Sequence, residues 1–346
     1  MKNRILLLLP IILLLSCQKD FMPEPVPDGL PVEVSFDFEI ARAHTKASTA
    51  TSYAWENRIN SVQYFIFNSN GQLEANFTNT GTGTVTRTIT TGSKTIWAVV
   101  NVPESRFSGC KTQSEFESRE VSLDDVASYS FPMSGSVTRT ITAGSNNVTI
   151  PVSQLVCRVI YQDIYNELEG CLEGEDIELE NIYLTNVVCN SKNTGAAPST
   201  IQWSTKCGRR DNATAASHFV EEYDDVEYNR WTFWDEWVTI SWSDDYGMSD
   251  YFYFFPNPTT SDRNGWAYPF TPRYTRIVAE LSIRGQRYYY PINLNGAQRN
   301  HSYDVYLTVT HPGSIDPDTF DWAEIQDVTI SIGGFDEWDD DLVITY

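Results

Sequence analysis

Residues 32–40 read VEVSFDFEI, and this stretch indicates the fold more clearly than any other in the chain. Apolar and polar residues alternate strictly through it, which is the pattern of a β-strand with one dry face and one face in water. The residues of the dry face are Val32, Val34, Phe36, Phe38 and Ile40. The next stretch, 42–53, is polar and built of small residues, so we expect the strand to end in a loop.

Many further short strands are expected downstream, with turn signals between them. The turn 68–71 contains Asn-Gly, which supplies the positive φ that a tight hairpin needs. The expected strands cover residues 59–67, 84–90, 95–102, 136–152, 155–164, 177–188, 251–255, 276–283, 288–292, 303–310 and 327–332. One helix is expected in the first half, over 112–125. This pattern predicts an all-β protein made of antiparallel β-sandwiches.

The chain is long enough for two domains of ordinary size after its first residues, and we place the boundary near 151–158. The expected organisation is a signal peptide at 1–17, a flexible tether at 18–30 that is rich in proline, an N-terminal β-sandwich at 31–155 and a C-terminal β-sandwich at 156–346. The last part of the second sandwich ends in LVITY, whose Leu342, Ile344 and Tyr346 share one face at a period of two.

The first residues have the composition of a lipoprotein signal. Lys2 and Arg4 precede the apolar stretch 5–15, which is too short for the roughly 20 residues of a bilayer-spanning helix. Leu14 and Ser16 stand where a bacterial lipobox requires an aliphatic and a small residue before its cysteine. We therefore expect Cys17 to be lipidated and to become the N-terminus of a protein held at the outer membrane and exposed at the surface.

Charge and motifs exclude several classes of function. The chain carries 46 acidic against 24 basic side chains, a net charge of −22, so nucleic acid is not an expected partner. No nucleophile elbow, zinc-protease motif or phosphate-binding glycine loop occurs, so we expect no enzyme and no cofactor. The four histidines are scattered and no cysteines have metal-ligand spacing, so no metal is expected; the acidic loops 316–318 and 336–341 are interpreted as solvated rather than as calcium sites.

The cysteines and the clustered tryptophans can each be buried in the core or take a role at the surface. Cys157 and Cys189 lie in apolar runs and are interpreted as buried thiols, whereas Cys171 and Cys207 lie in polar segments and form the expected disulfide pair. Five tryptophans fall within 36 residues: Trp231, Trp234, Trp237, Trp242 and Trp266. They could stack on a host or bacterial glycan, although the alternation in WVTISW favours a position in the core.

The order of several motifs resembles the fimbrillins, the pilin-type lipoproteins of Bacteroidales. The segments that carry the resemblance are the lipobox at Cys17, VEVSFDFEI at 32–40, Arg42-Ala43, INSVQYFIFNSNGQLE at 59–74, KTIWAVVNVPES at 94–105, SFPMSGSV at 130–137, RYYYPINL at 287–294 and HPGSIDPDT at 311–319. The resemblance implies two transthyretin-like Greek-key β-sandwiches in tandem. It also implies a structural subunit of an adhesive cell-surface fimbrium.

The resemblance further implies how such a subunit assembles. A trypsin-like protease cuts after an arginine that follows the first strand, which here is Arg42 before Ala43. The removable strand, carrying Val32 to Ile40 on its dry face, then leaves a groove with unpaired backbone groups. A strand of a neighbouring subunit can add there, and the tail 328–346, ending in LVITY, is the expected donor. Other fimbrial subunits are then partners, and head-to-tail repetition builds a filament.

Two alternatives to the fimbrial subunit remain open at this point. Arg42 has Lys46 and Arg58 nearby and is equally well interpreted as an ordinary loop arginine. Without a cut, the same chain stays attached to lipid through Cys17 and fits the anchor role in a fimbrium. A surface lipoprotein that binds glycans is the other alternative.

Overall fold

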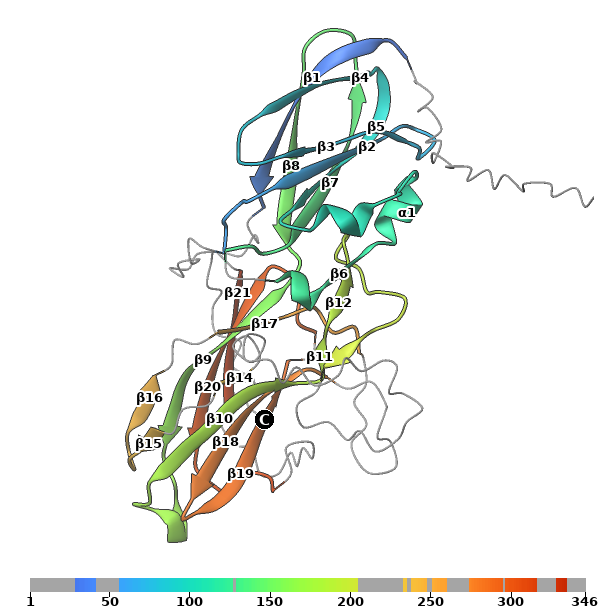
Figure 1. Ribbon diagram of the computed structural model, residues 1–346. Helices are drawn as coiled ribbons and strands as arrows, with labels where there is room; N and C mark the ends of the chain where they lie inside the picture. Colours follow the sequence, from blue (N-terminus) through green and yellow to red (C-terminus); the bar gives the residue numbers. More distant parts are fainter. Residues whose placement is uncertain are drawn as a thin grey trace, which may run out of the picture.

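Strands dominate the chain and form two lobes stacked end to end, joined where β8 passes into β9 (Figure 1). The computed structural model describes residues 29–41, 56–126, 129–204, 233–234, 238–247, 251–259, 274–294, 296–315 and 328–334. In the described residues the protein is mostly β, as the sequence predicts.

The strands of the N-terminal lobe form one sheet in the order β3-β2-β5-β7-β8-β1-β4. Their bounds are β1 (Pro31–Ile40), β2 (Val62–Phe67), β3 (Leu73–Asn79), β4 (Val85–Thr90), β5 (Gly92–Val100), β7 (Met133–Ile141) and β8 (Asn146–Gln154). The Asn-Gly turn joins β2 to β3 as expected, because Gly71 has φ 72° and its N–H donates to the carbonyl of Asn68 at 2.9 Å.

The sheet opens into two layers between β7 and β8. These strands pair only through Met133 with Gln154 and Ser134 with Ser153. The backbones pass so closely beyond that point that a Cβ on Gly135 would lie 1.7 Å from the carbonyl oxygen of Pro151. One layer is then β3-β2-β5-β7 and the other is β8-β1-β4, and the apolar core of the lobe fills the space between them.

The helix expected over 112–125 is wrong for most of its length. Helix α1 covers only Gln113–Glu117, started by a capping box between Thr112 and Glu115. The chain then forms strand β6 (Glu120–Ser122) and the 3-10 helix η2 (Leu123–Asp125). The helix stops because β6 pairs with β12 (Asn190–Lys192) of the other lobe, a partner that the local sequence cannot indicate. A further 3-10 helix, η1 (Glu104–Phe107), precedes α1.

The C-terminal lobe is built around two further sheets, with strand orders β14-β10-β18-β19 and β16-β9-β20-β21. Strand β15 also pairs with β10, and β17 with β9. The bounds are β9 (Cys157–Asn166), β10 (Ile177–Thr185), β11 (Val187–Val188), β13 (Trp203–Ser204), β14 (Phe233–Trp234), β15 (Val238–Ile240), β16 (Asp245–Gly247), β17 (Tyr251–Phe254), β18 (Arg276–Ile283), β19 (Gln286–Asn293), β20 (His301–Val309) and β21 (Val328–Gly334), with the 3-10 helix η3 (Gly170–Leu172) between β9 and β10.

Among the described strands, each lobe contains one parallel pairing within otherwise antiparallel sheets. Strand β1 runs parallel to β8, and β9 runs parallel to β20. The prediction of purely antiparallel sheets is therefore corrected at these two positions. In both lobes the first described strand of the lobe is the one that pairs in parallel, and its partner comes much later in the chain.

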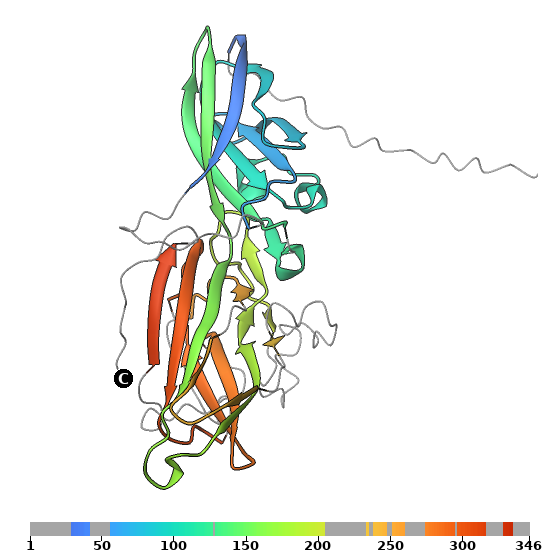
Figure 2. The same ribbon diagram turned by 90° about the vertical axis from the view of Figure 1, so that its left-hand side faces the viewer.

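The two lobes lie end to end (Figure 2), and a shared apolar cluster joins them. It runs from the outward side of β2 and β5 through Leu155 and Val156, at the crossing from β8 to β9, into the C-terminal core. Across the junction, the rings of Phe131 and Tyr253 have centroids 4.6 Å apart. The burial of the linking residues makes the junction part of the packed interior rather than a solvated hinge.

Candidate functional site

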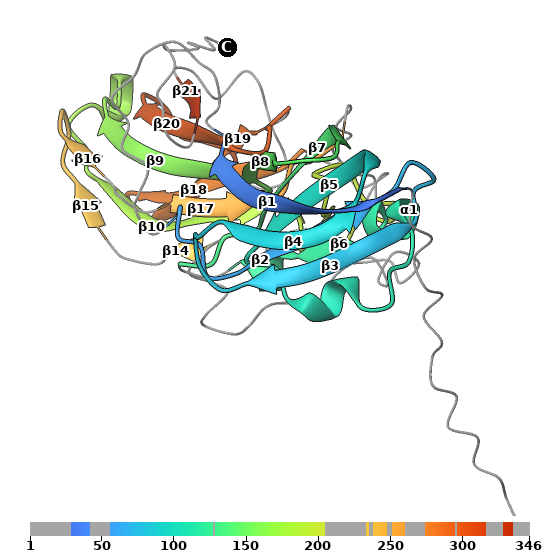
Figure 3. The same cartoon turned by 90° about the horizontal axis from the view of Figure 1, so that it is seen from above.

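Strand β1 is an internal strand that lies between β4 and β8 (Figure 3). Pro31 to Phe36 pair with β4 in antiparallel register, and Val34 to Ile40 pair with β8 in parallel register. Both edges of β1 are therefore used over its middle part. All of these contacts are non-covalent, and residues 42–55, which lie outside the described ranges, connect β1 covalently to the rest of the lobe.

The dry face of β1 is where the sequence predicts it. Val34 and Phe36 are fully buried, and Val32, Phe38 and Ile40 are partly buried against the same core. The ring centroid of Phe36 lies 6.0 Å from that of Tyr64 and 5.5 Å from that of Phe77, and these two rings come from β2 and β3 in the opposite layer. The ring of Phe36 thus packs against aromatic rings of the opposite layer.

The other face of β1 is polar. Glu33 and Glu39 are exposed, and the hydroxyls of Ser35 and Thr86 lie 3.3 Å apart across the β1–β4 pair. Burial raises the pKa of Tyr64 to about 12, and the negative charge of nearby Asp37 adds to that shift. A neutral tyrosine is therefore held under β1 at every physiological pH.

Both ends of β1 are fixed by hydrogen bonds. At the start, Leu30 and Thr91 exchange two bonds, from the N–H of Leu30 to the Thr91 hydroxyl at 3.0 Å and from the N–H of Thr91 to the Leu30 carbonyl at 2.9 Å. At the end, the N–H of Ala41 donates to the carbonyl of Val152 at 2.6 Å. The side-chain amide of Asn300, from the C-terminal lobe, donates to the carbonyl of Ala41 at 3.2 Å. The last described residue before the loop is thus held against both lobes.

The chain on the far side of the loop is fixed at the same junction by a buried carboxylate. Glu56 is fully buried, and Arg158 Nη1 lies 2.8 Å from both of its carboxylate oxygens. The hydroxyl of Tyr253 donates to Glu56 at 2.5 Å, and Arg158 Nε donates to the hydroxyl of Ser302 at 2.9 Å. These contacts connect the residues after the loop to β9, β17 and β20.

The electrostatics of this junction follow from its burial. Burial lowers the pKa of Arg158 more than any single neighbour raises it, but Glu56, Tyr253 and Asp304 together raise that pKa above its ordinary value, so the guanidinium stays charged. Burial raises the pKa of Asp304 to about 7, and nearby Arg158 opposes that rise. A buried ion pair whose hydrogen bonds are satisfied is costly to break, since either group alone would be an uncompensated buried charge.

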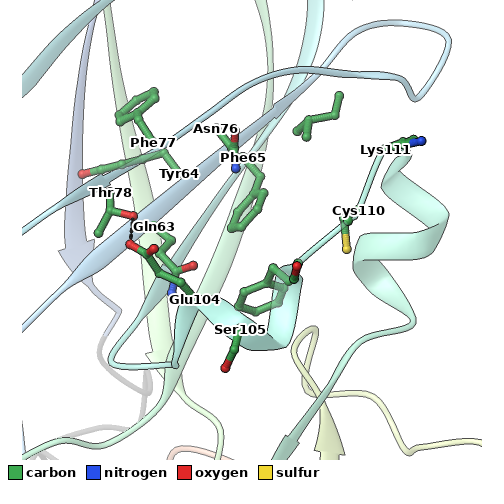
Figure 4. Close-up of a pocket in the computed structure, with 14 residues that line it drawn as sticks. Gln63, Tyr64, Phe65, Asn76, Phe77, Thr78, Glu104, Ser105, Cys110 and Lys111 are labelled. Atoms are coloured by element: carbon green, nitrogen blue, oxygen red, sulfur yellow. Dashed lines mark hydrogen bonds between the residues drawn. The ribbon is translucent and has the colours of Figure 1, made fainter. Parts of the chain in front are cut away.

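A hollow of about 390 Å³ lies on the outward side of β2 and β3 and faces η1 (Figure 4). Phe65 forms its floor, with ring centroids 5.1 Å from Phe107. The one carboxylate in its lining, Glu104, accepts a hydrogen bond of 2.5 Å from the hydroxyl of Thr78. Cys110 lies on the opposite wall. The hollow therefore presents a packing surface rather than a paired acid and base.

A second hollow, of about 460 Å³, lies at the far end of the C-terminal lobe. Trp242 borders it with its side chain 42% exposed, and the indole N–H donates to the carbonyl of Leu168 at 3.0 Å. Glu167, Glu169 and Glu173 complete most of the lining. The interpretation of Trp242 as a core residue is therefore wrong: its N–H fixes the ring at the surface. The side chains of the other four clustered tryptophans lie outside what the structure describes.

Several predicted site residues also fall outside the described ranges. These are Cys17, Arg42, Ala43, Leu342, Ile344 and Tyr346, together with Cys207 and the acidic loops at 316–318 and 336–341. Among the described cysteines, Cys157 and Cys189 are buried as expected, and burial raises the pKa of the Cys157 thiol. Cys171 is exposed and forms no disulfide with another described cysteine.

The described residues offer neither a metal site nor a membrane-spanning helix. No group of three or more His, Cys, Asp or Glu side chains in the described ranges is placed to hold a metal ion. Within the same ranges, no helix has the length and apolar character needed to cross a membrane. Sequence reasoning missed the Glu56–Arg158 pair, whose members are far apart in the chain and lie in segments with no distinctive motif.

The described strands form two β-lobes, and β1, at the start of the first lobe, is held in its sheet by pairing and packing. Residues 32–176 match the family described as major fimbrial subunit protein (FimA). The resemblance to the FimA-like fimbrillins stated from the sequence is thus confirmed over this part of the chain. Fimbrillins are structural proteins and not enzymes, in agreement with the sequence analysis.

Solved structures share the fold over most of the chain. A fimbrillin (FimA) from Porphyromonas gingivalis has 14% identity and a TM-score of 0.60, covering 87% of this chain and 97% of its own. A candidate cell adhesion protein from Bacteroides eggerthii has 17% identity and a TM-score of 0.63, covering 89% and 97%. One from Parabacteroides distasonis has 13% identity and a TM-score of 0.60, covering 88% and 99%. No curated protein gives a significant match.

Proposed function

We propose that this protein is a structural subunit of a cell-surface fimbrium, that it assembles by proteolytic removal of β1 followed by strand exchange, and that it serves adhesion. The observation that carries the proposal is the position of β1. It is the first of the described strands, it is internal to a sheet, and non-covalent contacts with β4, β8 and the core hold it. One cut in the loop after Ala41 would therefore leave β1 attached by these contacts alone.

Loss of β1 would create a strong demand for a replacement strand. The places of Val34 and Phe36 would open to water, exposing on the order of several hundred Å² of apolar surface at roughly 25 cal/mol per Å². Backbone groups of β4 and β8 would lose their partners as well, and unpaired strand edges attract other strands. A strand from a second subunit satisfies both demands at once.

The proposed processing and donor sites complete the cycle. A trypsin-like protease cuts between Arg42 and Ala43, and the tail with Leu342, Ile344 and Tyr346 supplies the strand that enters the next subunit. Other fimbrial subunits are then the partners, and each contact is head to tail, so the chain of subunits does not close.

Before processing, lipidation at Cys17 would hold the precursor on the outer membrane. Replacement of Cys17 by alanine is expected to abolish incorporation of labelled palmitate and to release the protein from the membrane fraction. Unchanged palmitate incorporation in that variant would remove the lipoprotein part of the proposal.

We further propose that the lobes are tandem transthyretin-like Greek-key sandwiches divided near residue 155, as 31–155 and 156–346. The repeated parallel pairing supports this division: β1 with β8 in the first lobe, and β9 with β20 in the second. A parallel pairing in the same place in both lobes is expected if the two lobes have the same topology.

The test of strand donation is deletion of residues 339–346. The shortened chain is expected to fold, to accept a strand after processing and to stop polymer growth, because it can no longer donate. Electron microscopy and SDS-resistant ladders after trypsin treatment would show this. Filaments formed by the shortened chain alone would contradict donation by the tail, and a melting temperature far below that of the full chain would mean that the tail pairs within its own lobe.

Two other roles have support of their own. Retention of β1 would make the same chain a lipid-held anchor subunit, because the fixed ends of the loop and the buried Glu56 suit a stable precursor as well. Glycan binding is favoured by the second hollow, where the exposed ring of Trp242 borders three glutamates. Retention of the mature chain on polysaccharide columns, lost on replacement of Trp242 by alanine, would identify the glycan binder.

A further inference from the structure

Strand β4 has β1 as its only paired neighbour among the described strands, so the departure of β1 raises the question of what keeps β4 in place. An isolated strand with no ladder is not stable in water by itself. The inference below rests on the proposed function, in which β1 leaves. It concerns the state of the acceptor after that step.

A buried ionic cluster connects the end of β4 to the opposite layer. Glu74 of β3 accepts hydrogen bonds from the backbone N–H of Thr90 at 2.6 Å and from its hydroxyl at 2.8 Å. Lys94 of β5 lies 2.6 Å from the other carboxylate oxygen of Glu74, and it donates to the Thr90 hydroxyl at 2.9 Å. The side chains of Lys94 and Glu74 are 0% and 7% exposed. We call these three residues the β4 clamp.

Two further contacts hold β4 to the same layer. The guanidinium of Arg87 lies 4.8 Å from the ring centroid of Phe77, a cation–π geometry that places the middle of β4 over β3. Ile89 is buried in the core between the layers. After Thr90 the chain enters β5 through the left-handed Gly92, with φ 122°, so the end of β4 is also fixed covalently.

Ile89 shares its core with Val34 and Phe36 of β1, but the clamp contacts and the Arg87–Phe77 contact use no atom of β1. An ion pair taken out of water adds little net stability compared with apolar residues of the same shape. It does fix geometry, since the Glu74 carboxylate can bond Thr90 and Lys94 together in one arrangement only. The buried pair is therefore better explained by positioning than by stability.

We infer that the β4 clamp holds β4 in place when β1 leaves, and that the space between β4 and β8 persists as a ready slot for an extended peptide. The slot spans two strand spacings, about 9–10 Å. It offers an antiparallel edge on β4 and a parallel edge on β8, so it selects a peptide that runs in the direction of β1. Glu74, Lys94 and Thr90 are positioning residues of this slot and do not themselves contact the incoming strand.

The test uses the mature chain nicked by trypsin in the loop after Ala41 and identified by intact mass. The probe is a fluorescent peptide of residues 31–40, whose uptake is followed by anisotropy. The test variant carries Glu74→Met and Lys94→Met together, which removes both buried charges while keeping apolar bulk. The matched control is Glu104→Gln, which weakens a carboxylate–hydroxyl contact to Thr78 on the same strand, β3, but does not reach β4.

Nicked wild type and the control are expected to take up the peptide with equal affinity, and the double variant with affinity about tenfold or more lower, the effect of losing one hydrogen bond to a charged group. Hydrogen exchange should show β4 amides protected in nicked wild type and exposed in the double variant. Equal uptake by the folded double variant would overturn the inference, as would unprotected β4 amides in nicked wild type.

A second variant and a second peptide separate failure of the clamp from failure to fold and from failure of the proposed donor. If the double variant does not fold, Thr90→Val removes the hydroxyl alone, and unchanged uptake and β4 protection in that variant count against the clamp. A second labelled peptide, of residues 339–346, tests the donor. Binding of the 31–40 peptide without binding of the 339–346 peptide refutes the proposed donor and leaves the clamp intact, whereas binding of neither peptide to nicked wild type means that no slot persists.

Discussion

Replacement of Phe36 by alanine tests how firmly β1 is held. The side chain is fully buried, and its ring packs against Tyr64 and Phe77 of the opposite layer. Removal of a phenyl ring from such a site costs about 3–5 kcal/mol, because the transfer free energy is lost and a cavity remains. Chemical unfolding of the intact chain should show a decrease of that size in the free energy of unfolding.

In the nicked chain the same loss acts on retention of β1. A change of about 3–5 kcal/mol corresponds to a roughly hundredfold to several-thousandfold weaker hold on the strand. Released peptide can be measured by size exclusion and mass spectrometry, and faster release should accompany faster polymer growth.

The matched control is Glu33→Ala, on the exposed face of the same strand, for which a change within about 0.5 kcal/mol is expected. A shift below about 1 kcal/mol for Phe36→Ala, or an equal shift for both variants, would refute the reasoning that the dry face of β1 holds the strand.

Three further perturbations test other parts of the fold. Arg158→Met should lower the free energy of unfolding by about 3–5 kcal/mol by leaving Glu56 a buried unpaired charge, and Glu56→Leu in the same chain should restore most of it in denaturant titrations. The pKa of Asp304 is about 7, above the roughly 3.9 of an unfolded aspartate, so the folded chain binds more protons between these values and this residue's contribution to stability falls as the pH rises from about 4 to about 7. Unfolding midpoints at pH 5 and pH 8 should therefore differ less in Asp304→Asn than in wild type, and an unchanged difference would count against the assignment. Gly135→Val should cost about 1–3 kcal/mol or more in thermal melts, since its Cβ would collide with the carbonyl of β8, whereas Gly83→Ala, which has open space around it, should melt like wild type.

The sequence predicts strands best where one face is dry and the other is wet. The alternation at 32–40 predicts β1 and its buried side chains because period two is a local property of the chain. Strand β18 was predicted with its bounds as observed, even though all eight of its residues are buried, because its apolar run ends at the turn containing Gly285.

Long-range pairing is what the sequence does not reveal. The helix predicted over 112–125 fails because β6 finds its partner, β12, far along the chain. The parallel neighbour of β1 is likewise distant, since β8 is separated from it by the whole lobe. For the site, the dry face of β1 was predictable, but Glu56 and Arg158 were not. Each is an ordinary charged residue in sequence, and only the fold takes the pair out of water.

Strand β1 is antiparallel to one neighbour, β4, and parallel to the other, β8, and this arrangement bears on which of its residues can be substituted. A strand entered backwards would be parallel to β4 and antiparallel to β8, so its backbone groups would miss both established registers. The direction of the strand between β4 and β8 is thus selected by backbone hydrogen bonding, which does not depend on its side chains. The outward-facing residues of β1, and of any strand that takes its place, can therefore change without reversing the direction in which that strand enters the sheet.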